Sequence, residues 1–283
     1  MSEWLLAVHS GAGRYGSANE AAYLSLLRSA LESGREAISR AGSPPTAAQI
    51  AALVVQSFEH SALTNAGLGA NLTENRRVEC AASVVCGRTR LVGACAAVAG
   101  VREPSALALK LLEQAETVEK GDTTPAFAFG RQPPLVVVGE HAREVARGFG
   151  LETASDGVDE LERYQVTTQA EKQWKKWHRR FQSAAEATEN QIKVEQNEEE
   201  ERLDTVGAIC MDPMGNVAVA LSSGGVAYKV PGRVGLAGCP RMGCDAANAV
   251  VPAVTKAISR KRKRSGASKS KNAFAVACTG RVK

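Results

Sequence analysis

The chain has 283 residues, of which 44% are apolar and 23% are charged. This length and apolar share allow a sizeable core and exclude a wholly disordered chain. The sequence contains no apolar run near the roughly 20 residues of a membrane span, and its start lacks the basic and apolar parts of a secretory signal. We therefore expect an intracellular protein without a membrane segment.

The net charge of +5 is unevenly distributed along the chain. Residues 205–283 contain 13 Lys or Arg and 2 Asp or Glu, whereas residues 1–204 contain 22 and 28. Such a split indicates two differently charged parts. We predict an N-terminal part over 1–204, with a polar helical insert at about 155–203, and a C-terminal part over 205–283.

Two helices are predicted to follow a first strand. Residues 4–9 form an apolar run that ends in a Gly-rich turn, which is typical of a short buried strand. The helix predicted within 19–42 has an apolar face made of Leu24, Leu27, Leu31 and Ile38. The next helix, within 43–60, is expected to begin at Ser43 or Thr46, because a hydroxyl there can cap it.

The middle of the chain continues this alternation. A glycine-punctuated loop from about residue 63 leads into two strands that end near residue 99, and a helix follows with Pro104 near its start. A strand and a helix are expected within 134–150. Next comes a long polar helix within 167–202, expected to pack only partly, with His178 in solvent.

The C-terminal part begins with strands again. Residues 205–212 and 216–223 are expected to be sheet strands joined by a turn, with a third strand over 224–230. Strands and helices, a polar insert and then further strands indicate a layered α/β fold. The seven cysteines form no CxxC pair and lie mostly in apolar surroundings. We therefore expect reduced, buried thiols, no metal and no cofactor.

Asp204 and Thr205 lie between a carboxylate-rich run and the first of these strands. They either mark a loop-to-strand boundary or form a self-cleavage site. In the second case Thr205 Oγ attacks the carbonyl of Asp204, and water hydrolyses the resulting ester. The freed amine of Thr205, with a pKa of about 7.7–8.0, can then act as the base for its own hydroxyl.

Four separate motifs resemble those of the asparaginase-type N-terminal-nucleophile hydrolases, and most closely the taspase (threonine aspartase) branch. They are "VHSGAG" at 8–13, "LTNAGLGANLTENRRVECAAS" at 63–83, "GVREPSALALKLL" at 100–112 and "LDTVGAICMDPMGNVAVALSSGGVAYKVPGRVG" at 203–235. The resemblance implies an αββα sandwich, paired αβ units and self-cleavage between Asp204 and Thr205. It makes Thr205 the nucleophile.

The resemblance also implies roles for residues around this threonine. The Ser223 hydroxyl would lie beside the Thr205 amine, and the Asn65 side-chain amide near the nucleophile, although either residue can equally serve a turn. Thr279 and Gly280 would supply oxyanion-hole donors. The helix and strands that follow this pair in the family are absent, so the sandwich is expected to be incomplete at its C-terminal end.

Two residues bear on the substrate. Arg233 would hold an aspartyl carboxylate, because a guanidinium binds a carboxylate through two hydrogen bonds. Leu236 stands where the small-substrate enzymes of the family have an Asp that pairs with a free α-amine, and an apolar side chain cannot do this. The resemblance therefore implies a threonine endopeptidase that cuts protein substrates after Asp.

Two other functions remain open. One is an asparaginase or isoaspartyl peptidase that acts on small substrates, and the other is a catalytically impaired homologue that acts as a binding partner. The basic run Arg260–Arg264 indicates a nuclear-localisation segment or a solvated linker, and we expect a nuclear and cytoplasmic protein. No groove-reading helix accompanies it, so specific nucleic-acid binding is not expected.

Overall fold

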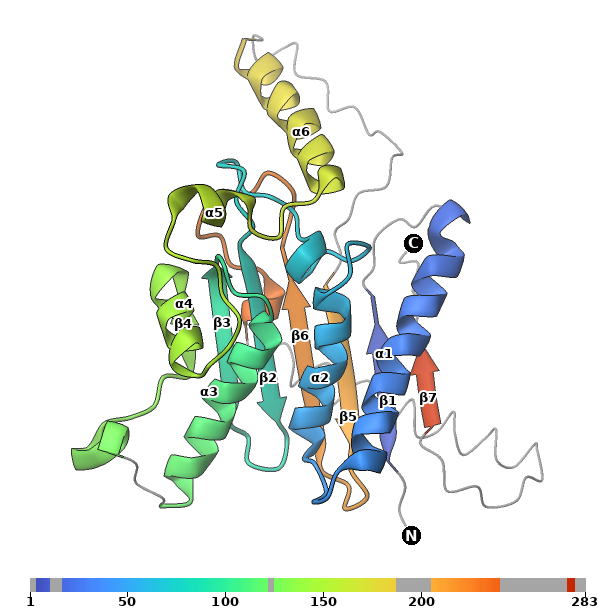
Figure 1. Cartoon of the computed structure of the whole chain (residues 1–283), viewed down its shortest axis with the longest axis vertical. Coiled ribbons are helices and arrows are strands. Elements are labelled where there is room, and N and C mark those ends of the chain that lie inside the picture. Colours follow the sequence, from blue (N-terminus) through green and yellow to red (C-terminus); the bar gives the residue numbers. More distant parts are fainter. Residues whose placement is uncertain (1–3, 11–16, 122–124, 187–204, 240–273, 278–283) are drawn as a thin grey trace.

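The computed structural model describes residues 4–10, 17–121, 125–186, 205–239 and 274–277 (Figure 1). Its strands pair in one mixed sheet in the order β4-β3-β2-β6-β5-β1-β7. The strands are β1 (Leu5–His9), β2 (Cys80–Cys86), β3 (Val92–Val98), β4 (Val136–Val138), β5 (Val206–Met211), β6 (Val217–Ser223) and β7 (Phe274–Ala277). The predicted layered α/β class is confirmed.

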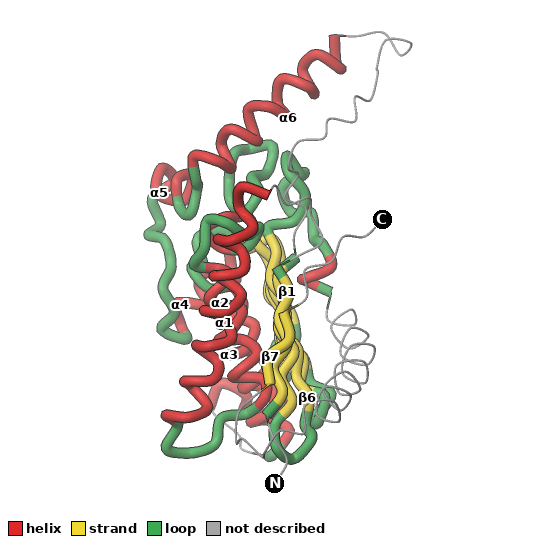
Figure 2. The backbone as a smooth tube through the Cα atoms, turned by 90° about the vertical axis from the view of Figure 1, so that its right-hand side faces the viewer, coloured by secondary structure: helices red, strands yellow, loops and turns green. Residues whose placement is uncertain are grey.

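Helices cover one face of this sheet, as the edge-on view in Figure 2 shows. The helices on this face are α1 (Glu20–Arg40), α2 (Ala47–Glu59), α3 (Pro104–Glu119) and α4 (Gly139–Gly148). Helix α5 (Val158–Arg163) lies near one end of the sheet, and α6 (Thr168–Glu186) projects beyond that end (Figure 1). Helix α2 packs on β5 and β6, and α3 packs on β2 and β3. The described residues thus supply one helix layer and one sheet layer of the predicted sandwich.

The strands on either side of Thr205 in sequence share this sheet. Strand β5 pairs with β1, and β6 pairs with β2, in antiparallel fashion. The predicted N-terminal and C-terminal parts therefore contribute neighbouring strands to one layer. Their division at Thr205 stays a prediction.

Helix α2 begins where the sequence indicated. Thr46 accepts a hydrogen bond from the Gln49 amide, and the Gln49 side chain accepts one from the Thr46 amide. This reciprocal capping box satisfies two backbone donors that a helix start otherwise leaves unpaired. Of the two predicted caps, Thr46 is the correct one.

The predicted apolar face of α1 is only partly right. Leu27 is buried, but Leu24 is 36% exposed, and the buried stripe also includes Tyr23, Ala30 and Gly34. A Cβ added at Gly34 would crowd side chains of β1 and α2. The helix therefore lies close to β1 and α2 at this glycine, while Leu31 and Ile38 are partly buried against the core as predicted.

Two further expectations fail outside the helix layer. Residues 224–230 do not form a strand. Tyr228 has a φ of 55°, which a strand does not accommodate, and its amide bonds to the Leu72 carbonyl. His178 on α6 is not in solvent: its ring stacks on Trp174 with centroids 4.5 Å apart, and its Nδ1 lies 2.8 Å from the Tyr228 hydroxyl.

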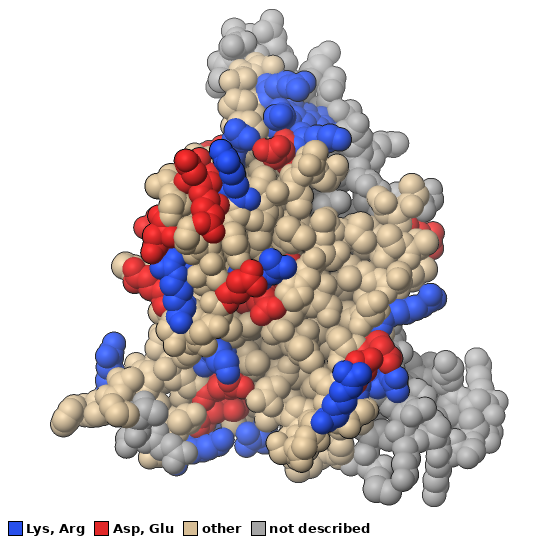
Figure 3. Space-filling view, viewed as in Figure 1, with Lys and Arg blue, Asp and Glu red and all other residues tan. Residues whose placement is uncertain are grey.

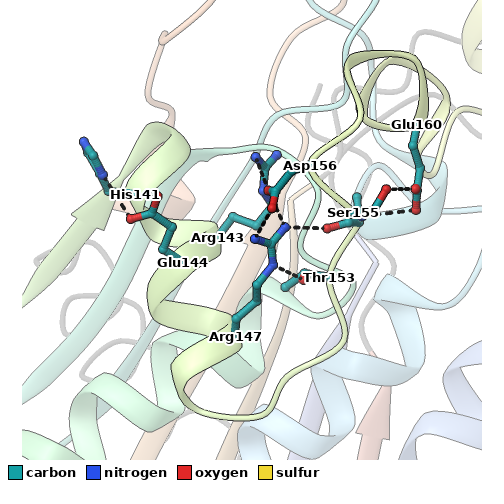
Figure 4. A network of polar contacts seen from close by, with 9 residues as sticks. His141, Arg143, Glu144, Arg147, Thr153, Ser155, Asp156 and Glu160 are labelled. Carbon is teal, nitrogen blue, oxygen red and sulfur yellow. Dashed lines mark hydrogen bonds and ion pairs between the residues drawn. The ribbon is translucent and has the colours of Figure 1, made fainter.

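The charged residues of the face shown in Figure 3 are unevenly placed. Lys and Arg side chains gather at the α6 end of the molecule. Helix α6 carries Lys172, Lys175, Lys176, Arg179 and Arg180. Nearer the sheet, α4 and the chain after it are joined by a polar network around Arg147 and Asp156 (Figure 4).

In the part of the chain that the structure describes, no helix has both the length and the apolar character needed to cross a membrane. Four cysteines, Cys80, Cys86, Cys95 and Cys210, are buried free thiols, and Cys239 is an exposed one. The prediction of reduced, buried thiols is confirmed for the first four. Cys244 and Cys278 lie outside the described residues.

Candidate functional site

Two strand ends bring the predicted nucleophile and its predicted partner together. Strand β5 begins directly after Thr205, and β6 ends at Ser223. In their antiparallel pairing Val206 lies opposite Ser222. Continuing this register by one residue puts Thr205 opposite Ser223. Thr205 is half-buried, whereas Ser223 is buried.

His9 lies against the backbone of the predicted nucleophile. It ends β1, where it pairs with Gly207, and its ring forms a hydrogen bond with the Thr205 backbone. A Cβ at Gly207 would overlap with the same ring. Burial lowers the pKa of His9, and the Thr205 bond only partly opposes this. A neutral imidazole held on Thr205 thus positions the start of β5.

The turn after β6 is fixed by the loop over residues 64–71, here called the asparagine loop. The Gly224 amide donates to the Asn65 carbonyl at 2.7 Å, and the Asn65 side-chain amide donates to the Gly225 carbonyl at 2.7 Å. Asn71 donates to the same Gly225 carbonyl. Gly225 has a φ of +71°, and a Cβ at Gly224 would lie 2.5 Å from Asn65 Oδ1. Both glycines are therefore needed for this close approach.

The structure thus places Asn65 on the glycine turn that follows Ser223. Its side-chain oxygen also accepts from the Asn71 amide at 2.8 Å. These bonds hold the turn, which is the simpler of the two roles expected from the sequence. The Ser223 hydroxyl in turn accepts from the Gly225 amide at 3.0 Å. The catalytic roles of Asn65 and Ser223 stay predictions.

A buried lysine that the sequence analysis did not single out holds the same turn. Lys229 is 5% exposed, and its Nζ donates to the Gly224 carbonyl at 2.6 Å and to the Glu79 carbonyl. Burial lowers the pKa of Lys229, and nearby Arg233 acts in the same direction. Its sequence signal was a single lysine in an otherwise apolar and glycine-rich segment.

The two predicted substrate residues lie next to this turn. The Arg233 guanidinium approaches Gly225 and Gly235: its Nη1 lies 3.3 Å and 3.2 Å from where their Cβ atoms would be. Arg233 is exposed, so its charge is available to a ligand. Leu236 is 59% exposed and begins a short 3-10 helix, Leu236–Gly238, that packs on β2 and β6.

A second residue that the sequence analysis did not single out lies behind the turn. Glu59, the last residue of α2, is fully buried, and its carboxyl accepts a 2.6 Å hydrogen bond from the Ser222 hydroxyl. Its other bonds come from the amide and hydroxyl of Ser105 at the start of α3. Helical spacing from the buried Val55 gave the only sequence signal that Glu59 faces inward.

Three predicted site residues lie outside the described residues: Asp204, Thr279 and Gly280. Their placement relative to Thr205 stays a prediction. Among the residues that are described, no cluster of three or more His, Cys, Asp or Glu could hold a metal ion. The site as described contains hydroxyl, amide and cationic groups around the start of β5.

Comparisons with known proteins identify the family of this chain. The asparaginase family model matches residues 2–256. The isoaspartyl peptidase of Escherichia coli K12 is 30% identical over 257 residues, which cover 89% of this chain and 70% of that protein. The plant-type L-asparaginase of Pyrobaculum calidifontis is 31% identical over 249 residues, 87% of this chain and 71% of that protein.

A vertebrate protein matches a similar share of the chain. The isoaspartyl peptidase/L-asparaginase of Xenopus laevis is 28% identical over 246 residues, which cover 87% of this chain and 67% of that protein. Together with the layered fold, these matches define a hydrolase of the N-terminal-nucleophile class. The chain belongs to the asparaginase family. The finer resemblance to the taspase branch stays a prediction.

Proposed function

We propose that this chain is a self-activating amidohydrolase in which Thr205 becomes the N-terminal nucleophile. The observation that carries the proposal is the placement of Thr205 opposite Ser223, with Arg233 beside the glycine turn that follows. A hydroxyl nucleophile, a neighbouring hydroxyl and a carboxylate-binding cation are the groups that hydrolysis of an aspartyl amide needs.

Activation breaks the bond between Asp204 and Thr205. Thr205 Oγ attacks the Asp204 carbonyl carbon, the C–N bond breaks, and an ester joins the two residues. Water then hydrolyses that ester, which leaves a new carboxylate on Asp204 and frees both the hydroxyl and the amine of Thr205. The amine is a suitable base because its ordinary pKa is about 7.7–8.0.

In turnover the same hydroxyl attacks the carbonyl carbon of the substrate. The Thr205 amine accepts the hydroxyl proton and passes it to the leaving nitrogen as the C–N bond breaks. The acyl group stays on Oγ as an ester until water hydrolyses it and regenerates the hydroxyl. Arg233 holds the free carboxylate of the aspartyl group through two hydrogen bonds, so that the scissile carbonyl faces Thr205.

The substrate that we propose first is a small isoaspartyl or asparaginyl compound. The support comes from the relatives, since the three proteins named above are isoaspartyl peptidases or asparaginases that match most of this chain. In such a compound the aspartyl carboxylate would pair with Arg233. Ammonia or an amino acid would leave.

A second substrate class is favoured by Leu236. This exposed, apolar residue occupies the position that, by the resemblance, carries an α-amine-binding Asp in the small-substrate enzymes. A free α-ammonium beside it would find no carboxylate partner, whereas a peptide nitrogen carries no charge and needs none. Asp204 itself would be the first residue bound in this manner. The second candidate is therefore an endopeptidase that cuts protein chains after Asp.

A substrate panel separates the two candidates. Purified protein is assayed with L-asparagine, a β-aspartyl dipeptide and a peptide with an internal Asp, and Leu236→Asp is compared with wild type. Small-substrate activity predicts release of ammonia or of the dipeptide's amino acid, with a roughly tenfold gain in Leu236→Asp because its carboxylate pairs with the free amine. Cleavage of the internal-Asp peptide alone supports the endopeptidase. If the protein turns over none of these substrates, both candidate activities are contradicted. The alternative that then remains is a catalytically impaired homologue that acts as a binding partner.

A further inference from the structure

The carboxyl of Glu59 is a buried ionisable group that the proposed chemistry does not use. Its side chain is 0% exposed. Its three hydrogen bonds come from neutral donors: the Ser222 hydroxyl at 2.6 Å, the Ser105 hydroxyl at 2.7 Å and the Ser105 amide at 3.0 Å. Burial raises the pKa of Glu59 to about 7, even though these bonds oppose the rise.

Ser222 connects this carboxyl to the glycine turn that follows Ser223. It directly precedes Ser223 and pairs with Val206, the residue after the predicted nucleophile. On the other side, Gly67 of the asparagine loop lies so close that a Cβ there would overlap with the Glu59 backbone. The same glutamate therefore contacts β6 and the loop that carries Asn65, and it joins both to the start of α3.

We propose that Glu59 is a positioning residue: its ionised carboxyl holds Ser222, and through it the turn from Ser222 to Gly225 and the start of β5, in the geometry that the Thr205 reaction requires. This inference rests on the proposed function and names a proton-linked support of the same site. Glu59 does not touch substrate and exchanges no proton with it.

The protonation state of Glu59 decides how many hydrogen bonds its carboxyl can accept. The ionised carboxyl accepts all three hydrogen bonds, with Oε1 shared by the Ser222 hydroxyl and the Ser105 amide. A proton on Oε1 would compete with the Ser222 hydroxyl for that oxygen, and one on Oε2 would have to donate to the Ser105 hydroxyl instead of accepting from it. Protonation also removes the charge of the carboxylate, and hydrogen bonds to a neutral acceptor are about half as strong, so the hold on the turn weakens.

Other titratable groups near Glu59 do not replace it. Cys80 on β2 and Cys95 on β3 have thiol pKa values raised by burial, that of Cys80 to about 11, so both are neutral near pH 7. Glu103, before α3, raises the pKa of Glu59 further, and its own carboxylate lies 2.7 Å from the His60 ring. Of the buried groups in this cluster, Glu59 is the one that titrates near neutrality.

The test compares Glu59→Gln and Ser222→Ala with Ser105→Ala as the matched control. For each variant, kcat and KM of the self-cleaved protein are measured from pH 5.5 to 9 with the substrate that wild type turns over. The inference predicts that Ser222→Ala lowers kcat about tenfold at pH 8 with KM unchanged, and that Ser105→Ala lowers it less than threefold.

The pH profile supplies a readout that a purely structural role would not change. In wild type the Thr205 amine must lose a proton to act, and protonation of Glu59 lowers kcat by up to about a further tenfold, so log kcat changes with a slope above one around pH 7. Glu59→Gln removes this second step and leaves a slope of one. Far-ultraviolet circular dichroism and thermal unfolding show whether each variant is folded. If Glu59→Gln does not fold, the comparison of Ser222→Ala with Ser105→Ala decides the test.

The outcomes distinguish this inference from the function on which it rests. An active wild type with Glu59→Gln showing the wild-type slope, or with Ser222→Ala no more impaired than Ser105→Ala, overturns the role of Glu59 and leaves the function intact. A wild-type chain that neither self-cleaves nor turns over any substrate overturns both.

Discussion

Two polar networks in this molecule differ in what surrounds them. Behind the active-site turn, Glu59 is wholly buried and is bonded by two serines. Beside α4, Arg147 binds Asp156 through two hydrogen bonds, but the Asp156 side chain is 74% exposed (Figure 4). The exposed network has both charges and the larger number of bonds. The buried one lacks a cation, yet it joins β6 to the start of α3.

The comparison indicates that the environment of a polar contact affects its contribution to stability more than the number of charged groups does. Water competes for both partners of the Arg147–Asp156 pair and screens their attraction, so such surface pairs contribute little to stability. Around Glu59 no bulk water can replace a lost donor, and each missing bond leaves a buried group unsatisfied. Substitutions in the two networks should therefore have very different effects.

The largest expected effect is a pH-dependent stability contributed by Glu59. Burial raises the pKa of Glu59 from its ordinary 4.5 to about 7. Between these values the folded chain keeps a proton that the unfolded chain has lost, so the free energy of unfolding falls as pH rises through this window and is flat above it. At about 1.4 kcal/mol per pKa unit, the fall is on the order of 3 kcal/mol.

Urea unfolding of wild type and Glu59→Gln from pH 5 to pH 8 measures this contribution. His9, whose pKa burial lowers, gives the opposite slope below its ordinary value, but it is present in both proteins and cancels in their difference. The difference between the two stability curves should change by the stated amount. Parallel curves would contradict a buried, titrating Glu59.

A smaller effect is expected at the other buried charge of the turn. Lys229→Met removes the donor to the Gly224 and Glu79 carbonyls. The loss of these bonds outweighs relief of the buried charge, and the free energy of unfolding should fall by about 2 kcal/mol. Chemical denaturation at pH 8 checks this, with the exposed Lys172→Met as control. Equal stability of the two variants would show that the lysine bonds are dispensable.

The smallest effect is predicted for the exposed network. Asp156→Asn removes the charge that pairs with Arg147 and Arg143. Because water hydrates the Asp156 side chain, which is 74% exposed, and Arg147 keeps its bonds to Thr153 and the Ala154 carbonyl, the melting temperature and kcat should both stay within error of wild type. A melting temperature lowered by several degrees would mean that this network stabilises the fold, and the comparison with Glu59 would then fail.

The elements that local pattern determines were predictable from the sequence. The Thr46 cap, the strands on either side of the 212–216 turn and the meeting of Thr205 with Ser223 follow from capping chemistry, alternation and the family motifs. Leu24, residues 224–230 and His178 were mispredicted. In each case contacts between distant segments decide the structure: α1 against β1, Tyr228 against Leu72, and α6 against Tyr228.

The charged residues behind the site illustrate the same limit. Sequence identifies a hydroxyl, an amide or an arginine as a candidate because its chemistry suits the reaction. Glu59 and Lys229 act on the backbone and on a serine, and such roles become visible only when α2, β6 and the turn are seen in contact. No periodicity distinguishes a supporting carboxylate from an ordinary helix end.

The most direct test of the central claim is the intact mass of purified wild type beside Thr205→Ala. If Thr205 is the nucleophile, wild type should separate into parts of about 22 kDa and about 8 kDa, as residue counts indicate, and the second part should begin with threonine. Thr205→Ala should remain one chain. An uncut wild type under all conditions, or cleavage at the same bond in Thr205→Ala, would contradict the account.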